Sequence, residues 1–134
     1  MIHNSYNIPM RSRTKLIPIY KSRGEIGAFL RFPYIFNTDG EWIGWVAADR
    51  CVYSVHGHYV GILSKEPRIL RNRELAGSRR RITPPSPPPP IRIPSLTPLA
   101  PQLPEVLLTM IDVLDEAPEL MPPTDYGNLR DDMD

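Results

Sequence analysis

The 134-residue sequence contains one cysteine, Cys51, so no disulfide can form within the chain. A lone thiol is consistent with a reducing compartment. No stretch approaches the roughly 20 apolar residues that a membrane-spanning helix needs. The first residues also lack the charged segment and apolar run of a secretory signal. These absences lead us to expect a cytoplasmic protein with no transmembrane segment.

Complete catalytic and metal-binding constellations are lacking as well. His56 and His58 flank a glycine, but no third ligand lies nearby in the sequence. Cys51 has no assignable histidine base. The glycines that stand out are not followed by a helix, as a phosphate-binding loop would require. We therefore expect no catalytic residue, no metal site and no cofactor, and a protein that is not an enzyme.

What is present is a short pattern repeated three times, in residues 19–30, 35–46 and 52–63. Each copy has a β-branched residue, an aromatic, three turn-compatible residues, a glycine, and then a β-branched residue directly before a second glycine. The spacing of about 17 residues suits one β-hairpin per copy. The repeated positions are Tyr20, Phe36 and Tyr53 for the aromatic, Gly24, Gly40 and Gly57 for the first glycine, and Gly27, Gly44 and Gly61 for the second.

These positions have a physical interpretation. The first glycine lies where a hairpin loop needs a residue at positive φ. The second lies inside the return strand, where glycine allows close approach of another backbone, and three of them indicate a symmetry axis. The aromatics are expected in the core. The first copy is one residue shorter between its glycines, so a local difference in register is expected there. A fourth copy begins at Arg68, but Glu74 replaces its turn glycine, so we expect only its first strand to be intact.

The pattern aromatic-x-x-x-Gly-x-x-Val/Ile-Gly/Ala, repeated at this interval over residues 16–76, resembles the four-fold beta flower domain. That resemblance implies a small bacterial module of four hairpins around a pseudo-four-fold axis, and it implies no active site. A weaker likeness is to the PRC-barrel, whose strands carry a similar motif with less regular repetition. The PRC-barrel likeness would place the protein at the periphery of a bioenergetic or photosynthetic membrane complex.

The fold class that we expect is therefore mainly β, a hairpin-repeat domain followed by a long proline-rich tail with one short α-helix. Ten of the 17 prolines lie in residues 82–104, where they favour an extended polyproline II spacer. The expected divisions are an N-terminal arm (1–15), the repeat domain (16–76), a basic and proline-rich linker (77–104), a short amphipathic helix (105–117) and an acidic tail (118–134).

Residues 104–116 favour the short helix, because Pro104 suits a first turn and Ala117-Pro118 would end it. This helix would be too apolar to stand alone in water. It could fold back on the repeat domain or dock on another protein, and docking is favoured because a domain of that size has little spare surface. We expect a partner to order the tail. The expected apolar contacts are Ile91, Ile93, Leu96, Leu99, Leu107, Met110, Ile111 and Leu114.

Charge is divided along the chain. Residues 1–104 carry a net charge of +9 and residues 105–134 a net charge of −8. The basic part includes Arg79, Arg80 and Arg81, which could meet an acidic protein, an anionic membrane surface, nucleic acid or the chain's own acidic tail. We expect a non-enzymatic accessory or scaffold subunit of a larger multiprotein assembly. The alternative is a nucleic-acid-binding module that uses the arginine cluster.

Overall fold

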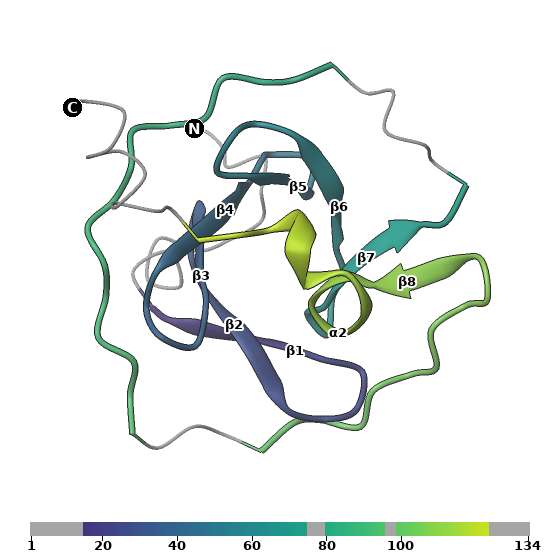
Figure 1. The fold of residues 1–134 in the computed structure, drawn as a ribbon. Helices are drawn as coiled ribbons and strands as arrows, with labels where there is room; N and C mark the ends of the chain where they lie inside the picture. The colour runs from purple at the N-terminus through teal and green to yellow at the C-terminus, as the bar shows by residue number, and fades with distance from the viewer. Residues whose placement is uncertain (1–14, 75–79, 96–98, 124–134) are drawn as a thin grey trace, which may run out of the picture.

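The computed structural model describes residues 15–74, 80–95 and 99–123. Within them, eight antiparallel strands form one curled sheet in sequence order (Figure 1). The elements are β1 (Ile17–Tyr20), β2 (Ile26–Arg31), β3 (Tyr34–Phe36), β4 (Trp42–Val46), β5 (Cys51–Ser54), β6 (Tyr59–Leu63), β7 (Ile69–Asn72), β8 (Met110–Asp112), α2 (Val113–Glu116) and the 3₁₀-helix η1 (Pro118–Leu120). The structure is mainly β, as predicted, and no helix in the described ranges is long and apolar enough to cross a bilayer.

The three predicted hairpins are β1–β2, β3–β4 and β5–β6, here called hairpins 1, 2 and 3. Their turns share one geometry, in which the glycine has φ of +103° at Gly24, +83° at Gly40 and +89° at Gly57. In hairpin 2 the Asn37 side-chain oxygen accepts hydrogen bonds from the Asp39 and Glu41 amides. Ser54 Oγ accepts from the His56 and His58 amides in hairpin 3. These side-chain oxygens stabilise the turns that the glycines permit.

The core lies along the pseudo-four-fold axis, where each hairpin contributes one fully buried β-branched residue. These residues are Ile19, Ile35, Val52 and Ile69. The aromatics Tyr20, Phe36 and Tyr53 follow the first three directly and are also buried. In hairpins 1 to 3, two consecutive side chains of the first strand are therefore buried.

The register of hairpin 1 differs from that of hairpins 2 and 3, as the glycine spacing of the first copy indicated. Ile35 pairs with Gly44 and Val52 pairs with Gly61, but Ile19 pairs with Ala28 rather than Gly27. The reason is the shorter spacing between the glycines of the first copy. Gly27 therefore lies one position earlier than Gly44 and Gly61 in its strand.

The fourth hairpin is complete, although the sequence predicted only its first strand. β7 pairs with β8, and the two strands are joined by the 37 residues 73–109 (Figure 1). The proline-rich segment is therefore a connection inside the fourth hairpin, not a tail after a finished domain. The predicted end of the repeat domain at residue 76 is wrong, because β8 belongs to the same sheet.

The predicted helix over residues 104–116 is wrong in most of its length. Residues 110–112 form β8, and only Val113–Glu116 are helical. An isolated helix of this length is marginally stable. Pairing with β7 instead satisfies the backbone groups of a strand that would otherwise be an exposed edge. Asp112, which lies within the segment predicted to be helical, is almost fully buried.

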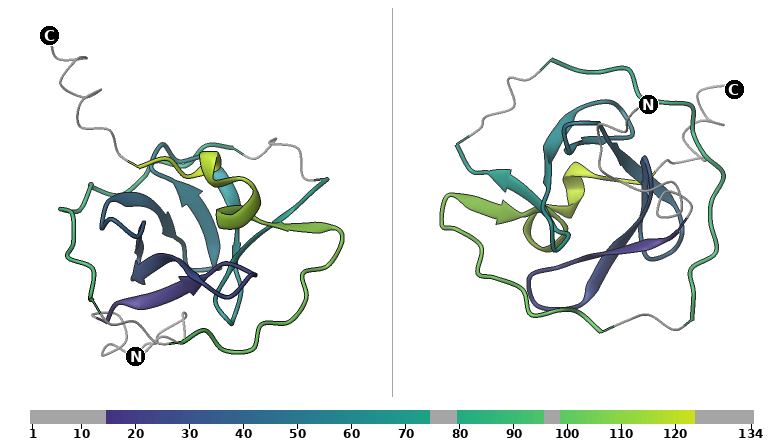
Figure 2. Two further views of the ribbon diagram at one scale, coloured as in Figure 1. Left: turned by 60° about the horizontal axis from the view of Figure 1, so that its bottom comes forward. Right: turned by 180° about the vertical axis from the view of Figure 1, so that it is seen from behind.

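The segment after β8 covers one end of the axis. α2 and η1 lie over the axis, inside the ring of hairpins (Figure 2). Val113, Leu114, Ala117 and Met121 are buried there, and three of them belong to the axial core cluster. We call residues 113–121 the plug. Its burial shows that this part of the C-terminal region folds back on the domain, which was the less favoured of the two expectations.

β8 does not pair with β1, so the sheet does not close. A polar junction joins the first and fourth hairpins at this place instead. Asp112 Oδ2 accepts hydrogen bonds from the Ser22 amide and hydroxyl, both at 2.6 Å. Arg68 Nη1 donates to Ser22 Oγ at 2.9 Å, and its Nη2 lies 3.1 Å from a Glu66 oxygen. Arg68 and Asp112 are both buried, so the junction replaces strand pairing with charged hydrogen bonds.

The described parts of the long connection, residues 80–95 and 99–109, run around the outside of the hairpins in both face-on views (Figures 1 and 2). We call them the belt. The Ile82 amide donates to Gly57 O at 2.9 Å, and the Ile91 amide donates to Gly40 O at 3.0 Å. The belt is thereby fixed by its backbone to the tips of hairpins 3 and 2.

Candidate binding surface

Several arginines that gave the sequence its basic character have structural roles. Arg50 donates to the carbonyl oxygens of Leu63 and Ser64, and Arg71 donates to those of Tyr59 and Val60. The Arg68 guanidinium is engaged in the junction between the first and fourth hairpins. Such contacts hold one loop or strand to the next and engage part of the hydrogen-bonding capacity of each guanidinium.

Two further arginines form ion pairs with carboxylates. Arg23 forms an ion pair with Asp115 of the plug, and this hydrogen bond raises the pKa of Arg23. Arg73 Nη2 lies 3.8 Å from Glu116 Oε1, a distance typical of a weak exposed pair. The acidic residues near the end of the described chain therefore neutralise part of the basic domain.

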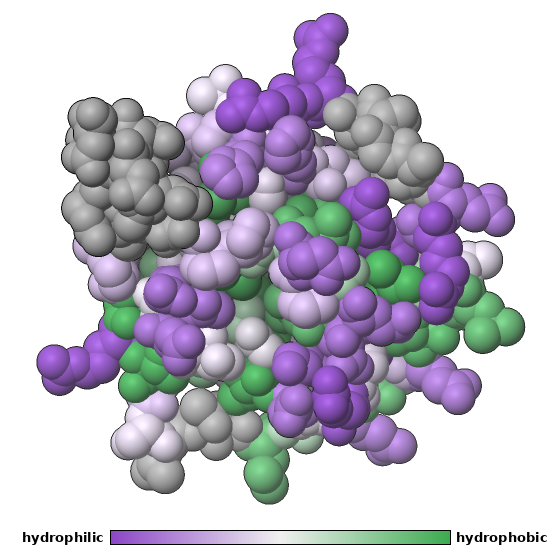
Figure 3. All heavy atoms as spheres, viewed as in Figure 1, coloured by the Kyte–Doolittle hydropathy of each residue, from purple (hydrophilic) through white to green (hydrophobic). Residues whose placement is uncertain are grey.

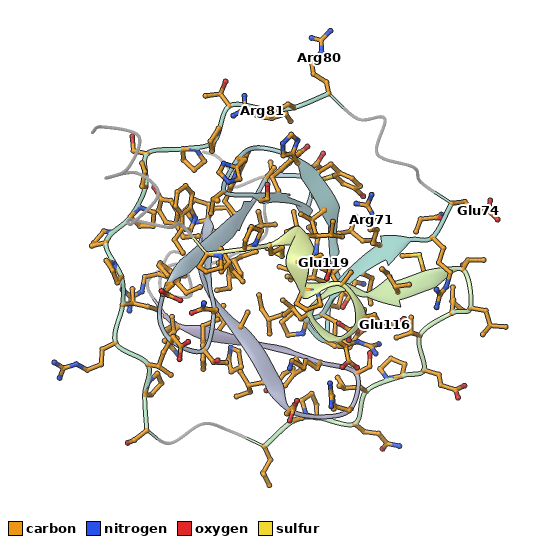
Figure 4. All side chains as sticks on the ribbon, viewed as in Figure 1. Arg71, Glu74, Arg80, Arg81, Glu116 and Glu119 are labelled. Carbon is orange, nitrogen blue, oxygen red and sulfur yellow. The ribbon has the colours of Figure 1, made fainter. Side chains whose placement is uncertain are left out.

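The predicted arginine cluster is only partly described. Arg79 lies outside the described residues. Arg80 is exposed and points away from the domain, whereas Arg81 lies over hairpin 3 and its Nε donates to His56 O (Figure 4). The structure thus shows one solvated arginine and one engaged in holding the belt, which is a small basic surface.

The apolar residues expected to contact a partner divide into three groups. Leu114 is buried in the plug, and Ile91 packs against an aromatic cluster of the domain, so neither faces a partner. Ile93, Met110 and Ile111 are partly buried. Leu99 and Leu107 are 94% and 71% exposed, and the neighbouring Leu108 is 91% exposed. Leu96 lies outside the described residues.

Leu107 and Leu108 occupy a braced turn just before β8. The Met110 amide donates to Leu107 O at 2.9 Å. From the other side of the hairpin, Arg73 donates through its amide to Thr109 O and through Nε to Leu108 O, both at 2.8 Å. These bonds fix the backbone of the turn, so the two leucines are presented to solvent in a defined arrangement.

The three exposed leucines, Leu99, Leu107 and Leu108, are here called the apolar arc. Apolar surface is visible at the edge of the molecule beside β8 (Figure 3). Single exposed apolar side chains are ordinary, but adjacent large ones on a fixed turn are typical of an interaction surface. Leu108 was not singled out in the sequence, because the predicted helix gave no reason to separate it from its neighbours.

A shallow cavity of about 450 Å³ lies beside the plug. Its polar lining comes from Lys21, Asn37 and Glu119, and its apolar lining includes Ile43, Leu114 and Met121. Lys21 forms an ion pair with Glu25 at 3.3 Å, and Asn37 stabilises its own turn. The lining holds no nucleophile beside a base, so it offers no catalytic arrangement.

The residues considered for metal binding or nucleophilic chemistry lie apart. Within the described ranges, no three His, Cys, Asp or Glu side chains are grouped to hold a metal ion. His56 and His58 are exposed at the tip of hairpin 3, and Cys51 is buried in β5. Nothing in this arrangement brings these side chains together.

Four hairpins around one axis, with the plug between them, define a β-hairpin-repeat module. The chain belongs to the 4-fold beta flower protein family, whose family model matches residues 17–110. The match begins at β1 and ends at the first residue of β8. A comparison with curated proteins and one with solved structures each found no match.

Proposed function

We propose that this protein is a non-enzymatic accessory subunit that binds a partner protein of a larger assembly through the apolar arc. The observation that carries the proposal is the exposure of Leu107 and Leu108 on a turn that is hydrogen-bonded to β7, with Leu99 exposed eight positions earlier in the belt. Burial of three leucines would contribute roughly 4–9 kcal/mol before the costs of association, at about 1.5–3 kcal/mol each. The braced turn lowers the ordering cost of binding.

A protein partner fits the charges near the arc better than an anionic surface does. Glu105 and Glu116 are exposed and lie close to Leu107 and Leu108 in the sequence, and Arg73 is already paired with Glu116. Carboxylates at this position would repel phosphate groups. The structural roles of Arg50, Arg68 and Arg71 also reduce the support for the nucleic-acid-binding alternative.

The test is a paired substitution, Leu107→Asp with Leu108→Asp, in the full-length chain. Tagged wild-type protein should copurify with a partner at a defined stoichiometry and retain it at high salt, because the contact is apolar. The variant should lose the partner while its thermal unfolding stays unchanged, because both side chains face solvent. The matched control is Ser95→Asp with Gln102→Asp, which adds the same charge at exposed positions of the belt outside the braced turn and should retain the partner.

Three results would count against the proposal. A variant that copurifies at full stoichiometry would show that the leucines are not the contact. Loss of the partner in both pairs of substitutions would assign the effect to charge. Binding of the wild-type protein to bare nucleic acid or anionic vesicles, with affinity that falls steeply as salt rises, would favour a phosphate-bearing partner instead.

A further inference from the structure

The belt lies on hairpins 2 and 3 at two equivalent seats. Ile82 and Ile91, nine positions apart, each donate a backbone hydrogen bond to the carbonyl of a turn glycine, Gly57 in one hairpin and Gly40 in the other. The contacts are so close that a Cβ built on Gly57 would lie 1.9 Å from Ile82 O, and one on Gly40 would lie 2.0 Å from Ile91 O. Only glycine admits the belt at these seats.

The surface between the seats is aromatic. Ile91 packs with Tyr34 and Trp45 against the buried cluster of Phe36, Trp42 and Val55. The Tyr34 hydroxyl donates to Ser86 O at 2.9 Å, in the middle of the proline tract. Six of the seven residues 84–90 are proline, which favours polyproline II. An extended proline-rich strand against aromatic side chains, with a tyrosine hydroxyl donating to its backbone, is the chemistry by which proline-rich ligands are recognised.

A comparison within the chain supports the specificity of these seats. Gly24 has the same turn and positive φ in hairpin 1, yet no described residue lies within 4 Å of a Cβ built there. The turn alone therefore does not attract the belt. Trp45 Nε1 is buried and has no hydrogen-bond partner among the described residues, so the belt leaves one donor of this aromatic surface unused.

We propose that the rim over hairpins 2 and 3 is a binding site for proline-rich segments, and that residues 80–91 are its intramolecular ligand. The occupant from another chain is a proline-rich segment of a partner protein with β-branched aliphatic residues nine positions apart. Because the belt is tethered, its effective concentration is high and the site is closed to weak ligands. A partner reaches the rim only when the belt is displaced. The site is separate from the apolar arc, so either proposal can fail alone.

The test loosens the belt without removing it. The substitutions Pro84→Gly, Pro85→Ser, Pro87→Gly, Pro88→Ser, Pro89→Gly and Pro90→Ser in the full-length chain remove the stiffness that preorganises residues 80–91. A synthetic peptide of wild-type residues 80–92 is then titrated against the loosened and the wild-type chains. Fluorescence of Trp42 and Trp45 reports binding, because both side chains belong to the cluster beneath Ile91.

The peptide should bind the loosened chain at least tenfold more tightly than the wild-type chain. A control peptide with Ile82→Asp and Ile91→Asp should bind neither. Equal affinity of the wild-type peptide for both chains, or binding to neither, would overturn the proposal. Binding of the control peptide as tight as that of the wild-type peptide would also overturn it, because the seats would then confer no specificity.

If circular dichroism shows that the loosened chain does not fold, the wild-type chain provides the measurement. Peptide at about 1 mM competes with an effective concentration of that order. Hydrogen exchange at the Ile82 and Ile91 amides should then become at least threefold faster, while the amide of Val52 in the core stays protected. Unchanged exchange at both isoleucines would overturn the proposal.

Discussion

Gly40 and Gly57 each satisfy two requirements at one residue. Both adopt positive φ, which L-residues with a side chain rarely do, and both lie directly beneath a carbonyl oxygen of the belt. Gly24 satisfies the first requirement only. The three turns therefore separate the cost of backbone strain from the cost of displacing the belt.

Substitution of these glycines by alanine should show that separation. Gly24→Ala should lower the free energy of unfolding by about 1–2 kcal/mol, the cost of a side chain in the left-handed region. Gly57→Ala should cost at least about 1 kcal/mol more, because the Ile82 hydrogen bond is lost as well. Urea denaturation of the two variants measures the difference. Equal losses would mean that the belt contributes nothing at this seat.

Glu66 makes the stability of the junction depend on pH. The Ser64 hydroxyl donates to this carboxylate at 2.7 Å and Arg68 Nε donates at 3.1 Å. The serine hydrogen bond is the main reason that the pKa of Glu66 is lowered from 4.5, and the arginine adds to the effect. A lowered pKa in the folded state means that the ionised carboxylate stabilises the fold.

This contribution should be fully present above pH 4.5 and should disappear as the pH falls through the folded-state pKa of Glu66. Glu66→Gln should be less stable than the wild type at pH 7, by at most about 1 kcal/mol because the side chain is partly exposed. The difference in free energy of unfolding between the wild type and the variant should become smaller at lower pH. Urea denaturation at pH 7, 5 and 3 checks this, and a gap that is independent of pH would contradict it.

At the scale of elements, the approach of β4 to β5 depends on Gly44. A Cβ at this position would lie 2.5 Å from Tyr53 O, a backbone atom of the next hairpin, and 2.5 Å from Met121 Cε in the plug. The methionine end can move, but the carbonyl cannot without opening the pairing of β4 with β5. Two hairpins and the plug thus meet at one glycine.

Gly44→Val should lower the free energy of unfolding by about 2–3 kcal/mol, the usual cost of forcing extra atoms into a packed core. Gly27→Val is the matched control, because its Cβ would meet only the flexible side chains of Lys21 and Leu114, at 3.0 and 3.1 Å. The free energy of unfolding of Gly27→Val should fall by less than half as much as that of Gly44→Val. Thermal and urea unfolding of the full-length variants decide the comparison, and similar losses would remove the close-approach explanation.

The sequence predicts those elements whose signals are local. Hairpins 1 to 3 follow from aromatic and glycine positions a few residues apart, and the positive φ of Gly24, Gly40 and Gly57 follows from turn chemistry. β8 and α2 could not be predicted in this way. Met110 and Asp112 become strand residues through pairing with β7, whose residues lie about 40 positions earlier, and tertiary contacts override local propensity.

The candidate surface is predictable only in part for the same reason. The many apolar side chains in residues 104–116 correctly indicate that part of this segment is buried. It does not distinguish Leu114, which the domain buries, from Leu107, which it leaves exposed. That distinction depends on where β8 begins. The seats for Ile82 and Ile91 depend on backbone contacts between distant segments, which composition does not encode.

At the scale of the whole molecule, the domain needs its C-terminal segment. A chain truncated after Arg81 lacks β8 and the plug, and it exposes Ile19, Ile35 and their neighbours at the axis. It should show no cooperative thermal unfolding. A chain truncated after Pro123 keeps every described element and should unfold within about 5 °C of the full-length protein, since about 1 kcal/mol shifts Tm by this much. Cooperative unfolding of the shorter chain would show that three hairpins and β7 suffice.

The 37-residue connection also imposes an order on folding. Replacing a loop of about five residues by one of 37 raises the entropic cost of closing the fourth hairpin by about 2 kcal/mol. Hairpins 1 to 3 can form from neighbouring segments, whereas the last closure waits for residues that a ribosome adds some 40 positions later. This late closure pairs β8 with β7. It also places the plug over the axis and forms the Asp112 junction. Until that event, β7 is an unpaired edge beside an open apolar axis, and the nascent chain is most prone to aggregation at this stage.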